Sequence, residues 1–472
     1  MPANAASMLQ STSMLTAIEA RNFKCFGANG INLDLNPLTL LVGPNGSGKS
    51  SALDAIALFA QTAAAVTAAA MGATGGFKWQ GIWADLGNDG RFAFRGTNLA
   101  SPMVLGLSVS GGESISRWLR DQGVGEETLS IPEKIKYAVK YSPKLGLSEH
   151  GIYLDGSLVA VRTTVAPQKG PAAGRYQDVL ELPNVPGLEK VQLNLIQSPA
   201  CVLSPILFSA SPSSGVPANT YSHLNNRLSM VSHFLTYMGS ILAAKTFIVG
   251  AERSPKDAEM KLEPGPLRVG RRGEKTLAVL SAMFARVDYG PQADRIRHWA
   301  GVFGLERLAG GWTGGPLLQA GYYDSNSETT LPIRYSGFGS QQILPVIVQL
   351  FAAPPGSLIM IEEPEISLHP EAQVSLVRMF ADAIAYGQQL IVTTHSETLL
   401  LALQQLRATK GLSPGDVAVY HFSRDETGAT AARLPLDENW YIKGWVPSFA
   451  AVEERLLKEW GAKLRANTEA ER

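Results

Sequence analysis

The sequence predicts an α/β protein in which both ends of the chain contribute strands to one parallel, helix-covered sheet. The apolar segment LTLLV (38–42) leads into a glycine-rich loop and then into a helical stretch. Two further apolar runs lie near the other end, SLIMIEE (357–363) and QLIVTTH (389–395), with helical patterns around them. Strands that alternate with helices in this way are typical of a parallel sheet flanked by helices.

Composition indicates a globular protein without a strong charge. Of the 472 residues, 45% are hydrophobic and 17% are charged, which suits a sizeable core. The 41 basic and 41 acidic residues balance, so the net charge gives no hint of nucleic-acid or membrane affinity. Cys25 and Cys201 are the two cysteines; so few argue against a disulfide scaffold and fit a reducing cytoplasm. No apolar run approaches the roughly 20 residues that span a bilayer, so we expect a cytoplasmic protein with no membrane partner.

The predicted division of the chain follows changes in its composition and hydrophobic pattern. Glycine and proline are frequent in the middle, where FAFRG (92–96), MVLGLSVSG (103–111) and GIYLDGSLVAVRTT (151–164) alternate as strands do. We expect a disordered leader without the features of a secretory signal (1–14), the N-terminal part of the core (15–70), a β-rich and helical insertion (71–240), a helical part of the core (241–329) and its C-terminal part (330–472).

Finer features fill these parts. We expect strands at TAIEARNFKCF (16–26) and INLDLN (31–36), and a helix after Lys49. VAPQKGPAAG (165–174) and SASPSSGVPANTYS (209–222) have loop compositions. Helical patterns take over from about Leu228, and a helix over 452–464 closes the chain.

The loop after LTLLV matches the phosphate-binding pattern G-x-x-x-x-G-K-[ST] without a mismatch. Its backbone N–H groups and the following helix start are suited to phosphate. Lys49 is expected to reach the β- and γ-phosphates, and the Ser50 hydroxyl to ligate Mg²⁺. The other interpretation, a chance glycine-rich turn, is weakened by the strand before the loop and the helix after it. The residues predicted to hold the nucleotide are Gly43, Pro44, Asn45, Gly46, Ser47, Gly48, Lys49, Ser50 and Ser51.

Two glutamates and a histidine follow the apolar runs at the other end of the chain. Glu362 is placed to hold Mg²⁺ through water, and Glu363 to take a proton from an attacking water. An acid-rich helix start is the alternative, and it explains one glutamate better than two. His395 could contact the γ-phosphate or order the water, or it could be a core histidine.

A glycine- and glutamine-rich segment, YSGFGSQQILP (335–345), precedes the glutamates. It opens an apolar helix, and a helix start presents N–H groups to anions. An ordinary capped helix is the alternative. Since the chain has one phosphate loop, a second phosphate-binding helix start needs a partner.

In this order the motifs resemble an ABC-type ATPase of the SMC/RecF branch, over about residues 15–60 and 330–400. EEPEISLHP (362–370) is most similar to OLD-like AAA-family ATPases, here without a Toprim domain, as in Septu or PARIS antiphage modules. The resemblance implies an ABC-like fold, ATP and Mg²⁺ as cofactors, Glu362 as the Walker B acid and Glu363 as the catalytic glutamate. It makes Lys49 and His395, the switch histidine, further catalytic residues.

The resemblance also implies a dimer or higher homo-oligomer with composite sites. Residues 336–342 would be the signature that completes the opposite protomer's site, and 367–370 the D-loop. Whether Ser340 or Gln341 meets the γ-phosphate stays open, and Gln80 and Gln197 are equal candidates for the Q-loop. The residues expected to reach the nucleotide from the second copy are Gly337, Gly339, Ser340, Gln341 and His369.

The predicted function depends on whether the sequence also contains nuclease motifs. OLD nucleases need an Asp-x-Asp pair in a Toprim domain, and this sequence contains none. We therefore expect an ATP-driven sensor or gate for a separate effector, a nuclease or toxin, in bacterial antiphage defence. The alternatives are a RecF-like clamp that binds DNA itself, and an ATP-binding scaffold with little hydrolysis.

Several basic residues admit two interpretations. Arg268, Arg271, Arg272 and Lys275 lie in a Gly/Pro-rich loop and could contact a DNA backbone, but a solvated loop is the favoured interpretation. Arg253 could assist at the nucleotide or pair with Glu252.

Overall fold

A computed structural model describes most of the chain, and all statements below concern this part. The described residues are 15–67, 77–87, 101–124, 130–142, 147–165, 177–183, 191–193, 218–255, 258–259, 265–312, 317–409, 412–443 and 455–460. The expected leader, FAFRG and all of VAPQKGPAAG except Val165 lie outside them.

The central sheet has six strands in the order β10-β15-β16-β3-β17-β18. All neighbours are parallel except the last pair, which is an antiparallel hairpin. The strands are β3 (Leu38–Val42), β10 (Thr246–Val249), β15 (Leu358–Glu362), β16 (Gln389–Thr394), β17 (Val417–Asp425) and β18 (Gly428–Leu434). Since β3 lies between β16 and β17, the predicted α/β core assembled from both chain ends is confirmed. β10 comes from the middle of the chain and was not predicted.

The second sheet has eight antiparallel strands in the order β2-β1-β4-β5-β6-β7-β8-β9. They are β1 (Leu15–Arg21), β2 (Ile31–Asp34), β4 (Met103–Ser110), β5 (Lys134–Ser142), β6 (Leu147–Leu154), β7 (Ser157–Val165), β8 (Gln177–Glu181) and β9 (Val191–Leu193). The β-rich middle of the chain therefore extends the sheet that β1 and β2 begin. The boundaries of the five expected parts stay a prediction.

Two expected strands end where the backbone turns. Segment 16–26 is a strand only as far as Arg21, because Asn22 and Lys24 take left-handed φ angles of 51° and 52°. Segment 151–164 contributes to two strands, which turn at Asp155 and Gly156, where φ is 48° and 83°.

Helices cover both faces of the central sheet. The described α-helices are α2 (Lys49–Thr67), α3 (Glu113–Asp121), α4 (Ala218–Lys245), α5 (Thr276–Phe284), α6 (Gly290–Val302), α7 (Phe338–Ala352), α8 (Pro370–Ala385) and α9 (Glu397–Leu401). α4 begins at Ala218, earlier than expected, and includes the end of a segment that we predicted to be loop. Residues 455–460 of the expected closing helix are helical, and the rest of that helix lies outside the described residues.

A small third sheet lies beside α5. It consists of β11 (Ala258–Glu259), β12 (Ala309–Trp312), β13 (Leu317–Asp324) and β14 (Thr329–Pro332). Short 3₁₀ segments occur at Val287–Tyr289, Ile333–Tyr335, Ala402–Ala408 and Pro414–Asp416.

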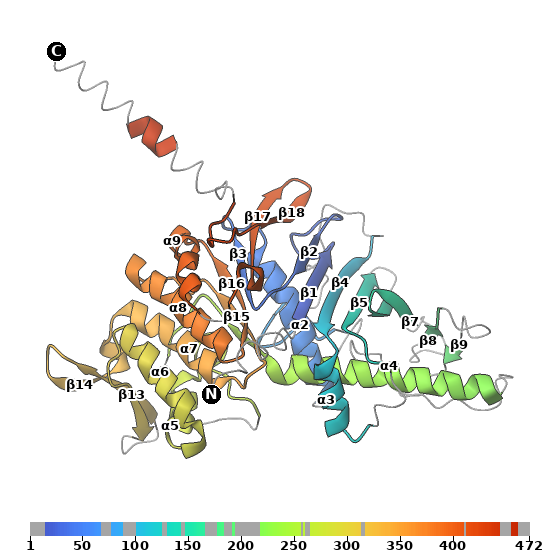
Figure 1. The fold of residues 1–472 in the computed structure, drawn as a ribbon, viewed down its shortest axis with the longest axis horizontal. Coiled ribbons are helices and arrows are strands. Elements are labelled where there is room, and N and C mark those ends of the chain that lie inside the picture. The colour runs from blue at the N-terminus through green and yellow to red at the C-terminus, as the bar shows by residue number, and fades with distance from the viewer. Residues whose placement is uncertain are drawn as a thin grey trace, which may run out of the picture.

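The layers follow from the alternation of apolar side chains along the central strands. In β15, Leu358 and Met360 pack into the core that contains α2 and the antiparallel sheet. Ile359 and Ile361 pack into the core on the other face, with α7 and α8. Figure 1 shows α2 between the two sheets and α7 and α8 on the far side of β15 and β16. This arrangement brings the carboxyl ends of β3, β15 and β16 to one edge. None of the helices in the described part of the chain has the length and hydropathy that a membrane span requires.

A buried glutamine joins the two sheets. The Gln389 side chain, 1% exposed, accepts a hydrogen bond from Leu15 N (3.0 Å) and donates one to Leu15 O (2.7 Å). At another point, the Tyr420 hydroxyl accepts from Asp34 N and donates to Asp34 O, at 3.0 and 2.9 Å. Side chains of the central sheet therefore complete the backbone hydrogen bonding of β1 and β2.

Replacing Gln389 with leucine is expected to lower the midpoint of thermal unfolding and to speed amide hydrogen exchange in β1. The substitution leaves Leu15 N–H and C=O without partners, and each buried unpaired group costs about 1–3 kcal/mol. Gln405→Leu, at an exposed position, is the control and should change neither measurement. Equal exchange of residues 15–21 in both variants would show that Gln389 does not hold β1.

Candidate active site

The loop between β3 and α2 has backbone angles and close contacts that only glycine can adopt at two positions. Gly43 has a φ of 144°, and a Cβ there would lie 2.3 Å from the Phe422 carbonyl oxygen. Gly48 has a φ of 112°, and a Cβ there would meet Cys25 Sγ and Ala429 at 3.0 Å. Both positions therefore require glycine. The loop presents Pro44, Asn45 and Gly46 to solvent, while Ser47, Gly48 and Lys49 are buried.

The residues of this loop fit a phosphate group. The Ser47 hydroxyl is buried and has no hydrogen-bond partner within the described chain, so it could donate a hydrogen bond to a bound anion. Lys49 Nζ donates to the carbonyls of Gly43 and Pro44 at 2.8 and 3.0 Å. Burial lowers the pKa of Lys49, and the carboxylates of Glu363 and Glu365 oppose that shift. α2 begins at Lys49 and directs its N-terminal end towards the loop.

Two oxygen ligands suited to a hard cation meet beside this loop. Ser50 Oγ donates to Glu362 Oε2 at 3.3 Å, and Glu362 ends β15. Mg²⁺ prefers oxygen ligands and is commonly held by one or two protein side chains together with phosphates. No cluster of three or more metal-ligating side chains occurs among the described residues. This pair fits Mg²⁺ bound together with a nucleotide.

Glu363 and His395 lie beside the lysine. His395 Nε2 is 3.1 Å from Glu363 Oε1 and 3.0 Å from Lys49 Nζ. Glu363 has a left-handed φ of 45°, and its N–H donates to the Thr393 carbonyl at 2.9 Å. The ends of β15 and β16 and the start of α2 thus bring Lys49, Ser50, Glu362, Glu363 and His395 together.

Glu365 was given no role from the sequence. Its Oε1 accepts hydrogen bonds from Thr394 Oγ1 at 2.6 Å and from His395 N at 2.8 Å. It therefore fixes the main chain that carries His395. The sequence signal was its place in the Glu-Glu-Pro-Glu run, where only the first two acids were assigned.

The signature segment is not joined to the loop of the same chain by any described contact. Ser340 Oγ donates to the Phe303 carbonyl at 2.8 Å, and Gln341 Nε2 to the Ser336 carbonyl at 2.9 Å. Gly339 packs against the D-loop, where a Cβ would lie 2.4 Å from Ser367 O. His369 caps α8 by accepting from Glu371 N at 3.3 Å. Gly337 is exposed at the N-cap of α7.

Comparisons with protein-family models agree with these features. A model described as "AAA ATPase domain" matches residues 14–81. A second, "AAA domain, putative AbiEii toxin, Type IV TA system", matches residues 208–402. The first spans the phosphate loop, and the second spans the glutamates and His395. Two segments of the chain, which carry the phosphate loop and the residues at the ends of β15 and β16, are thus similar to AAA-type ATPase domains.

Solved structures give distant similarities to this chain. The SMC head domain from Thermotoga maritima is 11% identical with a TM-score of 0.39, over 89% of this chain and 99% of that one. An SMC head with an extended coiled coil, bound to the C-terminal domain of ScpA and derived from Pyrococcus furiosus, is 11% identical with a TM-score of 0.43, over 89% and 96%. No curated protein matches the chain.

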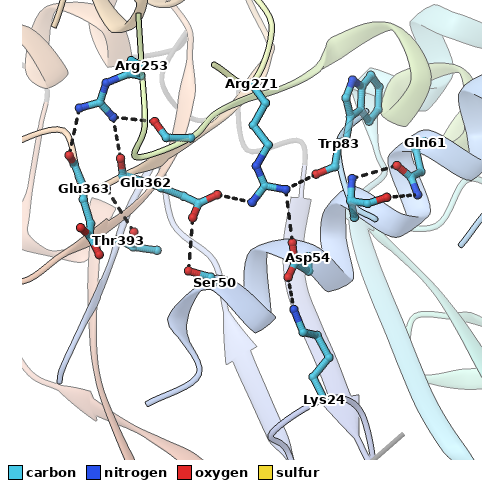
Figure 2. Close-up of polar contacts among 12 residues, drawn as sticks. Lys24, Ser50, Asp54, Gln61, Trp83, Arg253, Arg271, Glu362, Glu363 and Thr393 are labelled. Atoms are coloured by element: carbon cyan, nitrogen blue, oxygen red, sulfur yellow. Dashed lines mark hydrogen bonds and ion pairs between the residues drawn. The ribbon is translucent and has the colours of Figure 1, made fainter. Parts of the chain in front are cut away.

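Two of the four clustered basic residues turn towards the protein interior, so neither interpretation from the sequence holds for them. Arg271 binds Glu362 Oε1 and the Trp83 carbonyl, both at 2.5 Å, and lies 3.7 Å from Asp54, which also pairs with Lys24 (Figure 2).

Arg268, also half-buried, is the second of these two residues. Its Nη2 donates to the Ala243 carbonyl at 2.7 Å, and its guanidinium lies 4.5 Å from the rings of Trp83 and Phe247. Burial lowers the pKa of Arg268 to about 10. Arg272 is exposed and lies 3.9 Å from Glu252.

The Q-loop candidates find little support. Gln80 is exposed and forms a bridge with Asp85, while Gln197 lies outside the described residues. The segment 77–87 nevertheless reaches the site, because the Trp83 carbonyl accepts from Arg271. Gln61 of α2 holds this segment through hydrogen bonds with Ala84 N and O, both at 3.0 Å.

Replacing Arg271 with methionine is expected to strengthen divalent-cation binding to the nucleotide-loaded protein. The guanidinium occupies one oxygen of Glu362 and repels a cation at the other. Removing a like charge at a partly exposed site is worth on the order of 1 kcal/mol, or about fivefold in affinity. Mn²⁺ titration followed by electron paramagnetic resonance measures the effect, and Arg272→Met is the control. Weaker Mn²⁺ binding by Arg271→Met would show instead that Arg271 orients Glu362 for the metal.

Proposed function

We propose that this chain is a Mg²⁺-dependent ATP hydrolase whose nucleotide cycle gates a separate effector protein. The observation that carries the proposal is the meeting of Lys49, Ser50, Glu362, Glu363 and His395 at one edge of the central sheet. The orphaned Ser47 hydroxyl and the two constrained glycines support a bound phosphate at that edge.

Each residue has a distinct part in the proposed reaction. Lys49 and the loop N–H groups hold the phosphates, and Ser50 and Glu362 would hold Mg²⁺. The metal, when bound, would neutralise charge on the transferred phosphoryl group. Glu363 takes the proton of the attacking water. His395, fixed by Glu365, contacts the terminal phosphate or orders the water.

The active site is proposed to be completed by a second copy of the chain. Among the described contacts, Gly337, Ser340 and Gln341 have none with the phosphate loop, and Gly337 faces solvent at a helix start. Tyr335 and Phe338 on either side are 63% and 62% exposed, so this segment is open to a partner. In the dimer, Gly337, Gly339, Ser340, Gln341 and His369 would approach the nucleotide of the opposite copy.

The biological setting is also a proposal. One matched family model is described as a putative toxin of a toxin–antitoxin system, which is in keeping with a bacterial defence role. The OLD-like pattern EEPEISLHP (362–370) supports the same setting and a separate effector, because the sequence lacks an Asp-x-Asp pair. A DNA clamp is less well supported, since Arg268 and Arg271 are occupied within the core.

Two substitutions test the chemistry. Lys49→Ala is expected to abolish nucleotide binding or turnover. Glu363→Gln is expected to keep nucleotide affinity but lose about 10²–10⁴-fold in turnover, because it removes a positioned base. Phosphate release and calorimetric titration measure the two properties, with Glu371→Gln at an exposed position as the control. Parental turnover by Glu363→Gln would remove Glu363 from its role.

A mixing experiment tests the composite site. Gly337→Asp places a negative charge at the proposed phosphate contact while keeping an N-cap residue that helices favour. Gly339 is unsuitable because any side chain there would collide with Ser367 O. Lys49→Ala and Gly337→Asp chains should each be inactive alone and should regain phosphate release when mixed, since a mixed dimer can contain one intact site.

Gly337→Ser serves as the control in this experiment, because it caps α7 without adding a charge, and it should stay active. If the mixture of Lys49→Ala and Gly337→Asp chains is as inactive as its parts, while mass spectrometry shows mixed dimers, the opposite-protomer arrangement is wrong.

A further inference from the structure

Arg253 is fully buried next to the proposed catalytic glutamate. It follows β10, and its side chain is 0% exposed. Of the two interpretations from the sequence, the pairing with Glu252 is not observed, because Glu252 lies beside Arg272 at the surface. Figure 2 shows the Arg253 guanidinium facing the main chain of Glu362 and Glu363.

The guanidinium binds main-chain carbonyl groups from three segments. Nη1 donates to the carbonyls of Gly250 and Glu362, both at 2.7 Å, and Nη2 to the Glu363 carbonyl at 3.1 Å. Nε donates to the Gln342 carbonyl at 2.7 Å. The planar fork of arginine can satisfy such a set, whereas the ammonium of lysine has only three donors and cannot reproduce their geometry.

A second set of hydrogen bonds joins Arg253 to α7. Gln342, in α7, accepts from Arg253 N at 3.1 Å through its Oε1, and its Nε2 donates to the Arg253 carbonyl. Gln342 is 5% exposed. Arg253 and Gln342 therefore hold each other through both main chain and side chain. Since α7 begins at Phe338, this contact lies about one turn from the start of the signature helix.

The main chain that Arg253 holds has an unusual conformation. Glu363 has a φ of 45°, a left-handed value that costs free energy for a residue with a side chain. Its N–H is fixed by the Thr393 carbonyl at 2.9 Å, and its carbonyl by Arg253. These two bonds fix the main chain from which the Glu363 carboxylate projects.

We propose that Arg253 is a positioning residue that couples the first turns of α7 to Glu363. When a partner's nucleotide meets the signature, movement of α7 passes through Gln342 and Arg253 to the main chain of the catalytic glutamate. The inference rests on the proposed function in assigning Glu363 as the base, and it adds the residue that links that base to the signature helix.

Arg268 provides a matched comparison within the same chain. It too is an inward-facing arginine that donates to main-chain carbonyls, those of Ala243 and Thr246, although it is half-buried and Arg253 is fully buried. Burial lowers the pKa of both arginines to about 10. Arg268 makes no described contact with Glu362, Glu363 or α7. A purely structural role predicts the same consequences for the loss of either arginine.

The test compares Arg253→Lys with Arg268→Lys. Both are expected to lower the thermal unfolding midpoint. Only Arg253→Lys is expected to speed hydrogen exchange in residues 363–368 and in the first turns of α7, measured by mass spectrometry without nucleotide. In phosphate-release assays it should reduce kcat at least tenfold, with nucleotide affinity within about twofold of the parent, because positioning mainly serves the transition state.

A second variant, Gln342→Met, keeps the test informative if Arg253→Lys does not fold. It retains the guanidinium contact with Glu363 but removes the amide link, so it should speed exchange in the first turns of α7 and lower kcat. Equal exchange and equal kcat in Arg253→Lys and Arg268→Lys would overturn the proposal, as would unchanged exchange in Gln342→Met. If the parent protein hydrolyses no ATP, the proposed function fails, while the exchange measurements still decide whether Arg253 positions residues 363–368.

Discussion

The insertion of β3 between β16 and β17 is the interaction on which the rest of the structure depends. Val42 pairs with Thr394 and Leu41 with Thr393, so the phosphate loop and His395 start from adjacent strand ends. β15 pairs with β16 on its other side and brings Glu362 to the same edge. Without β3 in this position, the lysine and the two glutamates would belong to separate parts of the molecule.

Several carboxylates lie close together at this edge, and their mutual repulsion is a second constraint. Nearby cations and hydrogen-bond donors offset it. Arg271 pairs with Glu362, and Lys24 with Asp54. His395 lies against Glu363, while Thr394 and the His395 main chain bind Glu365. Buried charges are tolerated when each has a partner in good geometry. The cations come from the turn after β1 and from the loop before α5, so distant segments stabilise one another at the site.

The sequence was informative where function depends on local pattern. The phosphate loop, the apolar strands and the residues at their ends follow from spacing alone, and β3, β15 and β16 lie where they were expected. Side-chain direction in the loop 265–275 was not predictable, because glycine and proline remove the periodicity that shows which face is buried. Arg268 and Arg271 therefore read as a surface cluster, although tertiary contacts turn both inward. β10 and the start of α4 were missed because their neighbours in space are far away in sequence.

The contact between Gln389 and Leu15 spans 374 positions of the chain, and this separation has a consequence for synthesis. Pairing of segments that are far apart in sequence has an entropic cost of loop closure, and local structure does not offset this cost. Such pairing therefore slows folding. β3 gains both of its neighbours only after β17 has left the ribosome. The nascent chain therefore carries an exposed apolar strand and an incomplete phosphate loop for most of its elongation. A prematurely terminated product would have the loop sequence without the sheet that shapes it.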